Sequence, residues 1–463
     1  MPSANSLMGL MKWIGREEWR DDFAELFDRH LAPPCSAEGV KVEDLSSLIG
    51  EQEFMTLWGC AFEDFLTRDL GDGRNVVDDY LKRRGWKENT ADKAYMAALR
   101  SSVMSLYEVS NIVLGESFLA RDLVRGGDPV RVSEKSATKY LRQWDRIAAR
   151  VIEVRSKTVM SGGVLIFEQD LSEELLASLS RARKATVKGL LELMKSASYS
   201  LENGKADEIV SDNMVLQSSA FLFTNMWLGN YMNRIMHPRV PEMSNTDDEP
   251  LEFQSLHYSL LPGATAQAVR AALASIPELI AENDHFWNWV ESRRSTRTSS
   301  TLRFTTTMAN GAVVLGSLEL KQNTLILSVN SRGRGKRGKA LLGGVLTGMV
   351  REPFIETQTI EQMMSSRRGV QAKVSSGLSP EDERAFIHKS LDDHYETMLN
   401  EPIPSLGNTT PVETVKTAKG REKVIAWLKT PENHSARMPE ENSIATYDFK
   451  WLWHKLGLAD QRR

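Results

Sequence analysis

The sequence is poor in cysteine: Cys35 and Cys60 are the only two cysteines among 463 residues. Two thiols cannot build a disulfide framework or a four-cysteine zinc site, and such sparse usage is typical of a reducing compartment. The chain also lacks the run of about 18 apolar residues that a membrane-spanning helix needs. Residues 1–20 do not show the uninterrupted apolar core of a signal peptide. These absences predict a cytoplasmic protein with no membrane partner.

Strong net charge and catalytic motifs are also missing. The formal net charge of -4 is small for this length, so no overall field favours nucleic acid or anionic lipid. We find no G-x-S-x-G nucleophile elbow and no H-E-x-x-H metal motif. His388 and His394 are six residues apart, which places them on different sides of a helix. We therefore expect no metal, no cofactor and no catalytic residue, with an enzyme that lacks a recognisable motif as an alternative.

What the chain does contain is the composition of an ordinary globular protein. A hydrophobic fraction of 41% is sufficient to build packed cores. At 463 residues the length exceeds that of a single core, so several are expected. The spacing of apolar residues and turn signals predicts a multi-domain α+β protein. Its expected parts are a helical bundle (1–102), a small antiparallel β-barrel-like unit (103–168), a helical segment (169–243), a mixed α/β unit (244–364) and a C-terminal helical module (380–463).

The mixed α/β unit shows clear local signals. Phe253–Leu260 has the pattern of a strand, and Thr265–Glu282 has that of a helix. Val313–Leu320 and Thr324–Val329 are apolar runs on either side of a two-residue turn, which predicts a hairpin. The acidic run Asn245–Glu249 lacks the spacing of a calcium loop, and we interpret it as a linker turn.

A basic cluster follows the predicted hairpin. Its members are Arg332, Arg334, Lys336, Arg337 and Lys339. The interleaved glycines match G-x-G-x-x-G, but a dinucleotide site needs a parallel βαβ unit and the preceding strand belongs to a hairpin. If the cluster shares a face with Arg293, Arg294, Arg297 and Arg303, it predicts nucleic-acid binding through phosphate contacts. A solvated helix start is the alternative interpretation.

The C-terminal module has the most specific pattern in the chain. A helix must end before Pro402, because proline lacks the amide hydrogen and clashes with the preceding turn. Gly407 is free to adopt a positive φ. Thr410-Pro411 is a helix start, with a hydroxyl cap followed by proline in the first turn. Thr417 and Gly420 begin the next helix. The pattern therefore predicts short helices joined by proline-bounded turns.

These residues resemble the toxin-binding domain of the MbcA/ParS/Xre antitoxin family. The resemblance covers residues 392–430, and the positions that carry it are Leu399, Pro402, Leu406, Gly407, Pro411, Gly420, Val424 and Leu428. In that family the domain is a small helical bundle that docks a partner, typically a NAD-consuming toxin of the RES class. The resemblance implies a non-enzymatic protein that docks a toxin-like protein. The implied partner-binding residues are Leu399, Pro402, Pro404, Leu406, Gly407, Pro411, Gly420 and Arg421.

Two features separate this chain from the small antitoxins of that family. A long stretch of other sequence precedes the module, in place of a DNA-binding helix-turn-helix. The chain also continues into an aromatic segment, Trp451–Leu458, which could cover the partner groove. The module would then pack on its own chain, and the sequence leaves both arrangements open.

The middle of the chain has a second resemblance. It rests on Ser105–Val109, Ala120–Val124, Asp145–Arg150, Ser161–Gly163 and Leu325–Leu342. These segments are similar to uncharacterised bacterial proteins that often carry a SEC-C metal-binding motif. That motif needs clustered cysteines and is absent here, so this resemblance implies no reaction.

Overall fold

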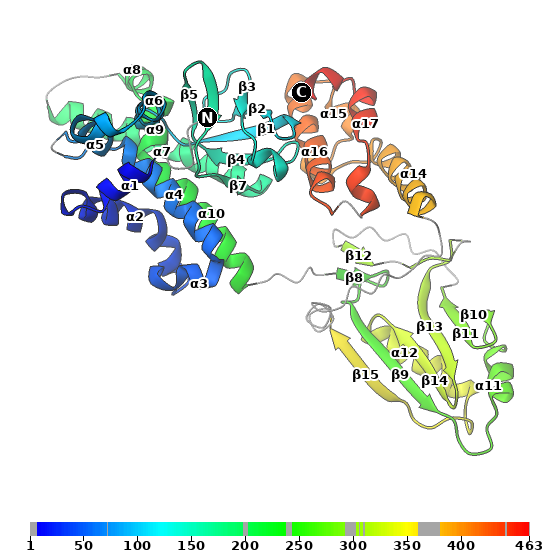
Figure 1. Ribbon diagram of the computed structural model, residues 1–463. Helices are drawn as coiled ribbons and strands as arrows, with labels where there is room; N and C mark the ends of the chain where they lie inside the picture. Colours follow the sequence, from blue (N-terminus) through cyan, green and yellow to red (C-terminus); the bar gives the residue numbers. More distant parts are fainter. Residues whose placement is uncertain are drawn as a thin grey trace. The chain divides into compact units, whose positions relative to one another are not determined.

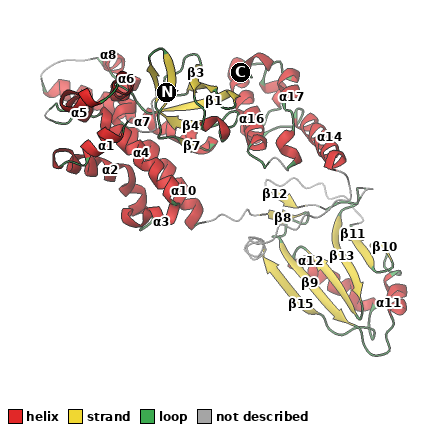
Figure 2. Ribbon diagram, in the orientation of Figure 1, coloured by secondary structure: helices red, strands yellow, loops and turns green. Residues whose placement is uncertain are grey.

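A computed structural model describes residues 7–71, 73–197, 202–237, 243–291, 302–304, 306–308, 311–359, 380–439 and 442–462. Helices and largely antiparallel sheets together confirm the multi-domain α+β class (Figures 1 and 2). The chain divides into two compact units. The first unit comprises residues 1–237 and 376–463, and the second comprises residues 238–375. Three of the five expected parts, and all but the last six residues of the part 169–243, therefore belong to the first unit.

The N-terminal part of the first unit is helical, as predicted. Its α-helices are α1 (Met8–Ile14), α2 (Glu17–Ala37), α3 (Leu45–Ile49), α4 (Glu51–Thr67), α5 (Val76–Arg84) and α6 (Thr90–Arg100). Local capping sets two of the helix starts: the side chain of Asn75 accepts from the amides of Val77 and Asp78, and Asn89 accepts from Asp92. Aromatic residues from several of these helices share one core. Its centre includes Trp19 and Phe65, whose rings meet edge to face at 6.4 Å.

The β strands of the first unit form an open sheet and a hairpin. The strands are β1 (Ser105–Val113), β2 (Ser117–Asp122), β3 (Val130–Ser133), β4 (Arg146–Ala149), β5 (Val151–Val154), β6 (Lys157–Met160) and β7 (Leu165–Phe167). Five of them pair antiparallel in the order β3-β2-β1-β4-β7, and β5 pairs with β6. This arrangement corrects the barrel-like expectation, because the sheet does not close on itself.

Other elements cover both faces of this sheet, which explains why it stays open. Leu106 and Ala148 on one face share a core with Leu175 and Phe223 from helices. Tyr107 and its neighbours on the opposite face share a core with residues that include Met160 of the hairpin. Short strands alone give the same signals in a barrel and in a covered sheet. Only long-range packing distinguishes a closed barrel from an open sheet that other elements cover.

Four helices follow the sheet in sequence. They are α7 (Gln169–Ser196), α8 (Asn203–Ile209), α9 (Asp212–Ser218) and α10 (Ala220–Met236). Phe223, Leu228 and Met232 of α10 pack in the core that contains Leu31 of α2. Within the described ranges, no helix combines the length and the hydropathy that a bilayer crossing requires.

The C-terminal module completes the first unit. Its elements are α14 (Pro380–Met398), η4 (Pro404–Leu406), α15 (Pro411–Thr414), α16 (Ala418–Ala436), η5 (Ser443–Thr446), α17 (Lys450–Lys455) and η6 (Ala459–Gln461).

The second unit is a six-stranded antiparallel sheet with helices on one face. Its elements are β8 (Met243–Asn245), β9 (Glu252–Ser259), α11 (Ala266–Leu273), β10 (Leu279–Asn283), β11 (Phe286–Val290), β12 (Leu302–Phe304), β13 (Val314–Lys321), β14 (Thr324–Val329), α12 (Arg332–Val345) and β15 (Phe354–Thr359). The sheet order is β10-β11-β13-β14-β9-β15, and β8 pairs separately with β12. Leu273 of α11 and Leu342 of α12 pack in one core with Leu256 and Leu325 of the sheet.

The local predictions for this unit were largely correct. The strand at Phe253–Leu260 is β9, and the hairpin is β13 with β14, which pair directly. The helix at Thr265–Glu282 was wrong in its second half, because α11 ends at Leu273 and β10 begins at Leu279. Pro277 lies between the two elements and disfavours a continuing helix.

Candidate protein-docking surface

The turns of the C-terminal module form as their residues predict. Helix α14 ends at Met398, ahead of Pro402. The hydroxyl of Thr410 accepts from the amide of Glu413 at 3.2 Å, and Pro411 is the first residue of α15. The hydroxyl of Thr417 accepts from the amide of Gly420 at 3.0 Å and begins α16. Local capping therefore defines the ends of the helices in this module.

The loop between α14 and α15 is held by its own hydrogen bonds. The Ile403 amide donates to the Thr409 carbonyl at 3.1 Å, and the Asn408 amide donates to the Ile403 carbonyl at 3.0 Å. Gly407 has a φ of 82°, as its position predicted. Asn408 follows it in the left-handed region at 57°. The loop has a defined shape without any partner.

Half of the predicted partner-binding residues are buried and half are exposed. The buried ones are Leu399, Leu406, Pro411 and Gly420, and the exposed ones are Pro402, Pro404, Gly407 and Arg421. Gly420 has no room for a side chain, since a Cβ atom there would lie 1.8 Å from the Thr414 carbonyl oxygen. Leu399 and Leu406 pack in the core of the module with Val424. The apolar positions of the pattern thus build the module itself.

The chain's own tail fills the apolar cleft that the sequence led us to expect. Leu452 and Trp453 of α17 are fully buried in the module's core. Trp144, from the loop before β4, joins the same core and stacks on Trp453 with ring centroids 5.9 Å apart. On this side the module packs on its own chain. The apolar side of the module is therefore occupied by the chain itself.

A buried carboxylate links the module to the sheet. Glu432 of α16 accepts from the indole nitrogens of Trp144 at 3.1 Å and Trp453 at 3.0 Å, and also from Arg462. The Lys429 ammonium lies 4.3 Å from the centroid of the Trp144 ring and pairs with Glu108 of β1. Burial lowers the pKa of Lys429, and the charge of Glu108 opposes that shift.

Asp145, next to Trp144, makes the second polar link. Its carboxylate accepts from Asn433 and from Arg437, both at 2.7 Å. Burial raises the pKa of Asp145, against the opposing effect of the Arg437 charge. The second half of α16 is therefore fixed against the sheet. Its first turn, which carries Arg421, stays exposed.

The basic cluster of α12 is largely paired with carboxylates. Arg332 pairs with Glu252 at 2.6 Å, and Lys339 pairs with Glu352 at 2.9 Å. Arg334 is 1% exposed and pairs with Asp247 at 2.8 Å, and Arg337 pairs with the same carboxylate. Burial would raise the pKa of Asp247, but the two arginines lower it.

These pairs change the interpretation of the cluster. Lys336 is exposed, while the other four cations contact acids of the same unit. The run Asn245–Glu249, interpreted as a linker turn, supplies Asp247. Arg293, Arg294 and Arg297 lie outside the described residues, as does the side chain of Arg303. Within the described residues, no specific observation favours nucleic-acid binding.

Gly338 of α12 allows the helix to pack closely on the sheet. A Cβ atom on Gly338 would lie 2.5 Å from the Leu327 side chain, so the missing side chain lets the helix approach the sheet. Strand β14 is antiparallel to both of its neighbours, as the hairpin prediction required. The carboxylate of Glu249 accepts from the cap residue Ser331 at the start of α12. The helix N-terminus already holds an anionic group of the chain.

The described residues contain no group of three or more His, Cys, Asp and Glu side chains that could hold a metal. His388 hydrogen-bonds through Nε2 to the Ser443 carbonyl at 2.8 Å, which joins α14 to η5. The ring of His394 meets that of Tyr395 edge to face.

A buried polar network in the first unit was missed by the sequence predictions. Asp64 of α4 is 1% exposed and contacts His30 Nε2 at 3.2 Å. Its carboxylate also accepts from Arg68 at 2.8 Å and from Arg150 at 3.3 Å. Burial alone would raise the pKa of Asp64, but the His30 hydrogen bond and the two arginines lower it to about 2.

The adjacent Glu63 has the opposite behaviour. Its carboxylate accepts from the Ser161 hydroxyl at 2.7 Å and from the Gly162 amide at 3.0 Å. Burial raises the pKa of Glu63, although Arg150 and these hydrogen bonds oppose the shift. The sequence signal for this network is two consecutive carboxylates inside the apolar run Cys60–Leu66. Charges on a buried helix need partners, which only the fold identifies.

Comparison with known families gives a partial match to this unit. Residues 60–199 match the model of a family of unknown function, DUF7986. The match is less than half of the 463-residue chain and runs from α4 through the open sheet to the end of α7. It therefore includes Glu63, Asp64 and Arg150. No curated protein and no solved structure matches the chain.

Proposed function

We propose that the C-terminal module docks a protein partner through its exposed side. The docking edge, as we define it, comprises Pro402, Pro404, Gly407, Val412 and Arg421. The single observation that carries the proposal is their exposure on a framework that the same chain holds fixed. Val412, in the short helix α15, contributes an apolar side chain that is 39% exposed. Apolar residues near one arginine are typical of protein-binding surfaces.

The rigidity of the docking edge supports this role. Hydrogen bonds within residues 403–409 fix the loop, and Glu432 and Asn433 fix α16 from behind. Arg421 donates through Nε to the Val415 carbonyl at 3.1 Å, which orients its guanidinium group. A surface that is already ordered loses less conformational entropy on binding. The docking edge is thus suited to a preformed, specific contact.

The resemblance to antitoxin toxin-binding domains supports a toxin-like protein as the partner. In this proposal the protein acts by binding and carries out no reaction itself. Arg421 would pair with a carboxylate of the partner, and Val412 would fill an apolar contact. Leu399 and Leu406 have a structural role, because they hold the edge in place from the core.

The test uses the purified full chain and a candidate partner, found by cross-linking in the source cells and then purified. Val412→Asp combined with Arg421→Glu is expected to raise the dissociation constant by about 30-fold or more, the effect of losing a binding hot spot. Val130→Asp is the matched control, since Val130 is a similarly exposed valine on β3. Unchanged binding by the double variant would refute the proposal, as would an equal loss in the control.

A further inference from the structure

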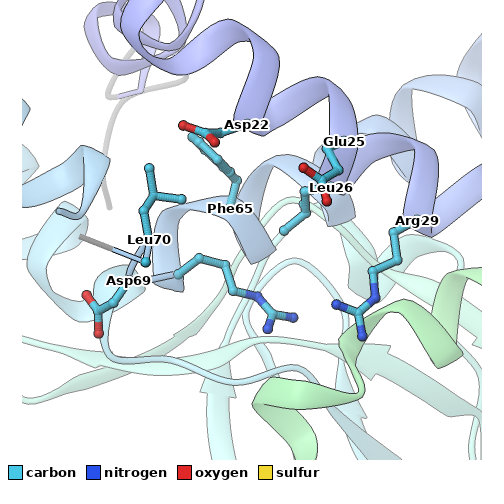
Figure 3. A pocket seen from close by; sticks show the side chains of 9 residues that line it. Asp22, Glu25, Leu26, Arg29, Phe65, Asp69 and Leu70 are labelled. Carbon is cyan, nitrogen blue, oxygen red and sulfur yellow. The ribbon is translucent and has the colours of Figure 1, made fainter. Parts of the chain in front are cut away.

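A pocket of about 250 Å³ lies beside the end of α4 in the first unit. Side chains from α2, from the last turn of α4 and from the segment after α4 line it (Figure 3). Three lining residues are apolar, three are acidic and two are basic: Leu26, Phe65 and Leu70; Asp22, Glu25 and Asp69; Arg29 and Arg68. A concave site with an apolar wall and a few charged groups is the usual form of a small-molecule site.

The guanidinium group of Arg68 is held in place and keeps donors available. Its Nε and Nη2 atoms donate to the Asp64 carboxylate at 3.2 and 2.8 Å. Asp64 is itself buried between His30 and Arg150. No described residue accepts from Nη1 of Arg68, whose side chain is 21% exposed. The buried network therefore orients one cationic group of the pocket.

Arg29 supplies a second cationic group without a carboxylate partner among the described residues. Its guanidinium group lies 4.3 Å from the centroid of the Phe221 ring. Glu25 stands one turn earlier on α2, beside Arg29, yet the two form no ion pair (Figure 3). Two guanidinium groups with free donors suit a carboxylate, which accepts such pairs of hydrogen bonds.

The acidic side chains of the pocket complement a cation. Asp69 is already paired with Arg100. Asp22 and Glu25 have no cationic side chain within ion-pair distance in the described part of the chain. The pocket thus offers free charges of both signs next to an apolar wall. Glu25 and Arg29 are exposed, while Asp22 and Arg68 are half-buried, so a ligand with charges of both signs would pair with both sets of side chains.

We propose that this pocket binds an α-amino acid with an apolar side chain. Its carboxylate would contact Arg29 and Arg68, and its ammonium group would contact Glu25 and Asp22. Leu26, Phe65 and Leu70 would cover its side chain. This site is separate from the docking edge, and neither proposal depends on the other.

Calorimetric titration of the full chain tests the ligand class. The probes are L-leucine, L-methionine and L-phenylalanine, together with two analogues of leucine. 4-Methylpentanoate lacks the amino group of leucine, and 3-methylbutylamine lacks its carboxylate. At least one amino acid is expected to bind saturably. The dissociation constants of the two single-charge probes should be at least about tenfold higher, since each probe loses a charge-assisted contact. Absence of binding by all three amino acids overturns the proposal, and equal binding of either single-charge probe overturns the zwitterion assignment.

Variants on α2 then locate the site. Arg29→Gln and Glu25→Gln are each expected to raise the dissociation constant of the amino acid about tenfold. Arg20→Gln is the matched control: Arg20 lies on the same helix, is exposed and pairs with Asp21. The Arg20→Gln variant should bind the amino acid with the same dissociation constant as the parent chain. Unchanged binding in both pocket variants, with their thermal unfolding also unchanged, would place the ligand elsewhere and overturn the proposal.

Discussion

Glu63 and Asp64 are neighbours whose pKa values move in opposite directions. The pKa of Asp64 falls to about 2, so its stabilising contribution is present above the ordinary aspartate pKa and is lost as the pH falls towards 2. The pKa of Glu63 is raised, so its contribution is present below the ordinary glutamate pKa and is lost as the pH rises. The sign of each contribution depends on which contacts the fold provides.

Glu63→Gln tests this assignment. Glutamine keeps one carbonyl oxygen to accept from the Gly162 amide, and its amide NH2 group can donate to the Ser161 hydroxyl oxygen. It cannot ionise, so the variant lacks the free-energy cost that the parent incurs on ionising a buried group. We expect the unfolding midpoint of Glu63→Gln to rise relative to the parent as the pH goes from 4 to 8, measured by thermal unfolding. Glu51→Gln, at an exposed position of the same helix, should follow the parent across this range. Parallel curves for Glu63→Gln and the parent would contradict the raised pKa.

At the scale of elements, the start of α16 shows how a tight contact overrides helix propensity. Gly420 is the third residue of the helix, where alanine would ordinarily be preferred. A Cβ atom there would meet the Thr414 carbonyl at 1.8 Å, and that backbone belongs to α15. The glycine therefore sets how closely α15 and α16 approach.

Two glycine substitutions should shift stability in opposite directions. Gly420→Ala must displace α15, and we expect it to lower the free energy of unfolding by about 1–3 kcal/mol, the usual cost of overpacking. Gly189→Ala in α7 meets no atom within 4 Å and should raise the free energy by up to about 1 kcal/mol through helix propensity. Urea unfolding of both variants measures the difference. A stabilising Gly420→Ala would show that the approach of the two helices can relax freely.

Local signals explain which elements could be predicted from the sequence. The hairpin of β13 and β14 and the starts of α15 and α16 depend on residues within a few positions of one another. The second half of the Thr265–Glu282 prediction failed because β10 gains its partner, β11, from the sheet. Pairing with another strand can override a helical pattern that is otherwise acceptable.

At the scale of the whole molecule, the two units differ in how local their cores are. The main core of the second unit comes from residues 256–346 alone. In the first unit, the sheet shares one core with helices on both sides of it in sequence, and Trp144 joins the core of the C-terminal module. The segment 103–168, expected as a separate domain, contributes to several cores that other segments complete.

Fragments should reveal this difference. Residues 238–375, produced alone, are expected to unfold cooperatively with urea, because their core is self-contained. Residues 103–168 alone should show no cooperative transition, since one face of their sheet would lose its helical cover and Trp144 would be exposed. Circular dichroism during urea titration measures both. Cooperative unfolding of the shorter fragment would contradict a shared core.

The candidate docking surface shows the same division between sequence and fold. The pattern located the turns of the module and four exposed positions, Pro402, Pro404, Gly407 and Arg421. It left open whether Trp451–Leu458 covers the apolar cleft, and it did not indicate that Trp144 would help to close it, because Trp144 lies far away in sequence. It also gave no sign that Asp247 would pair with Arg334 and Arg337.

The sequence by itself determined the α+β class, the ends of capped or proline-bounded helices and the hairpin of the second unit. Each follows from short-range geometry and hydrogen bonding, which act between residues close in the chain. The tertiary structure alone decided that the sheet stays open, that the tail fills the module and that Glu63 and Asp64 meet Ser161, His30 and Arg150. Those outcomes depend on burial, which brings distant residues together and requires buried charges to find partners.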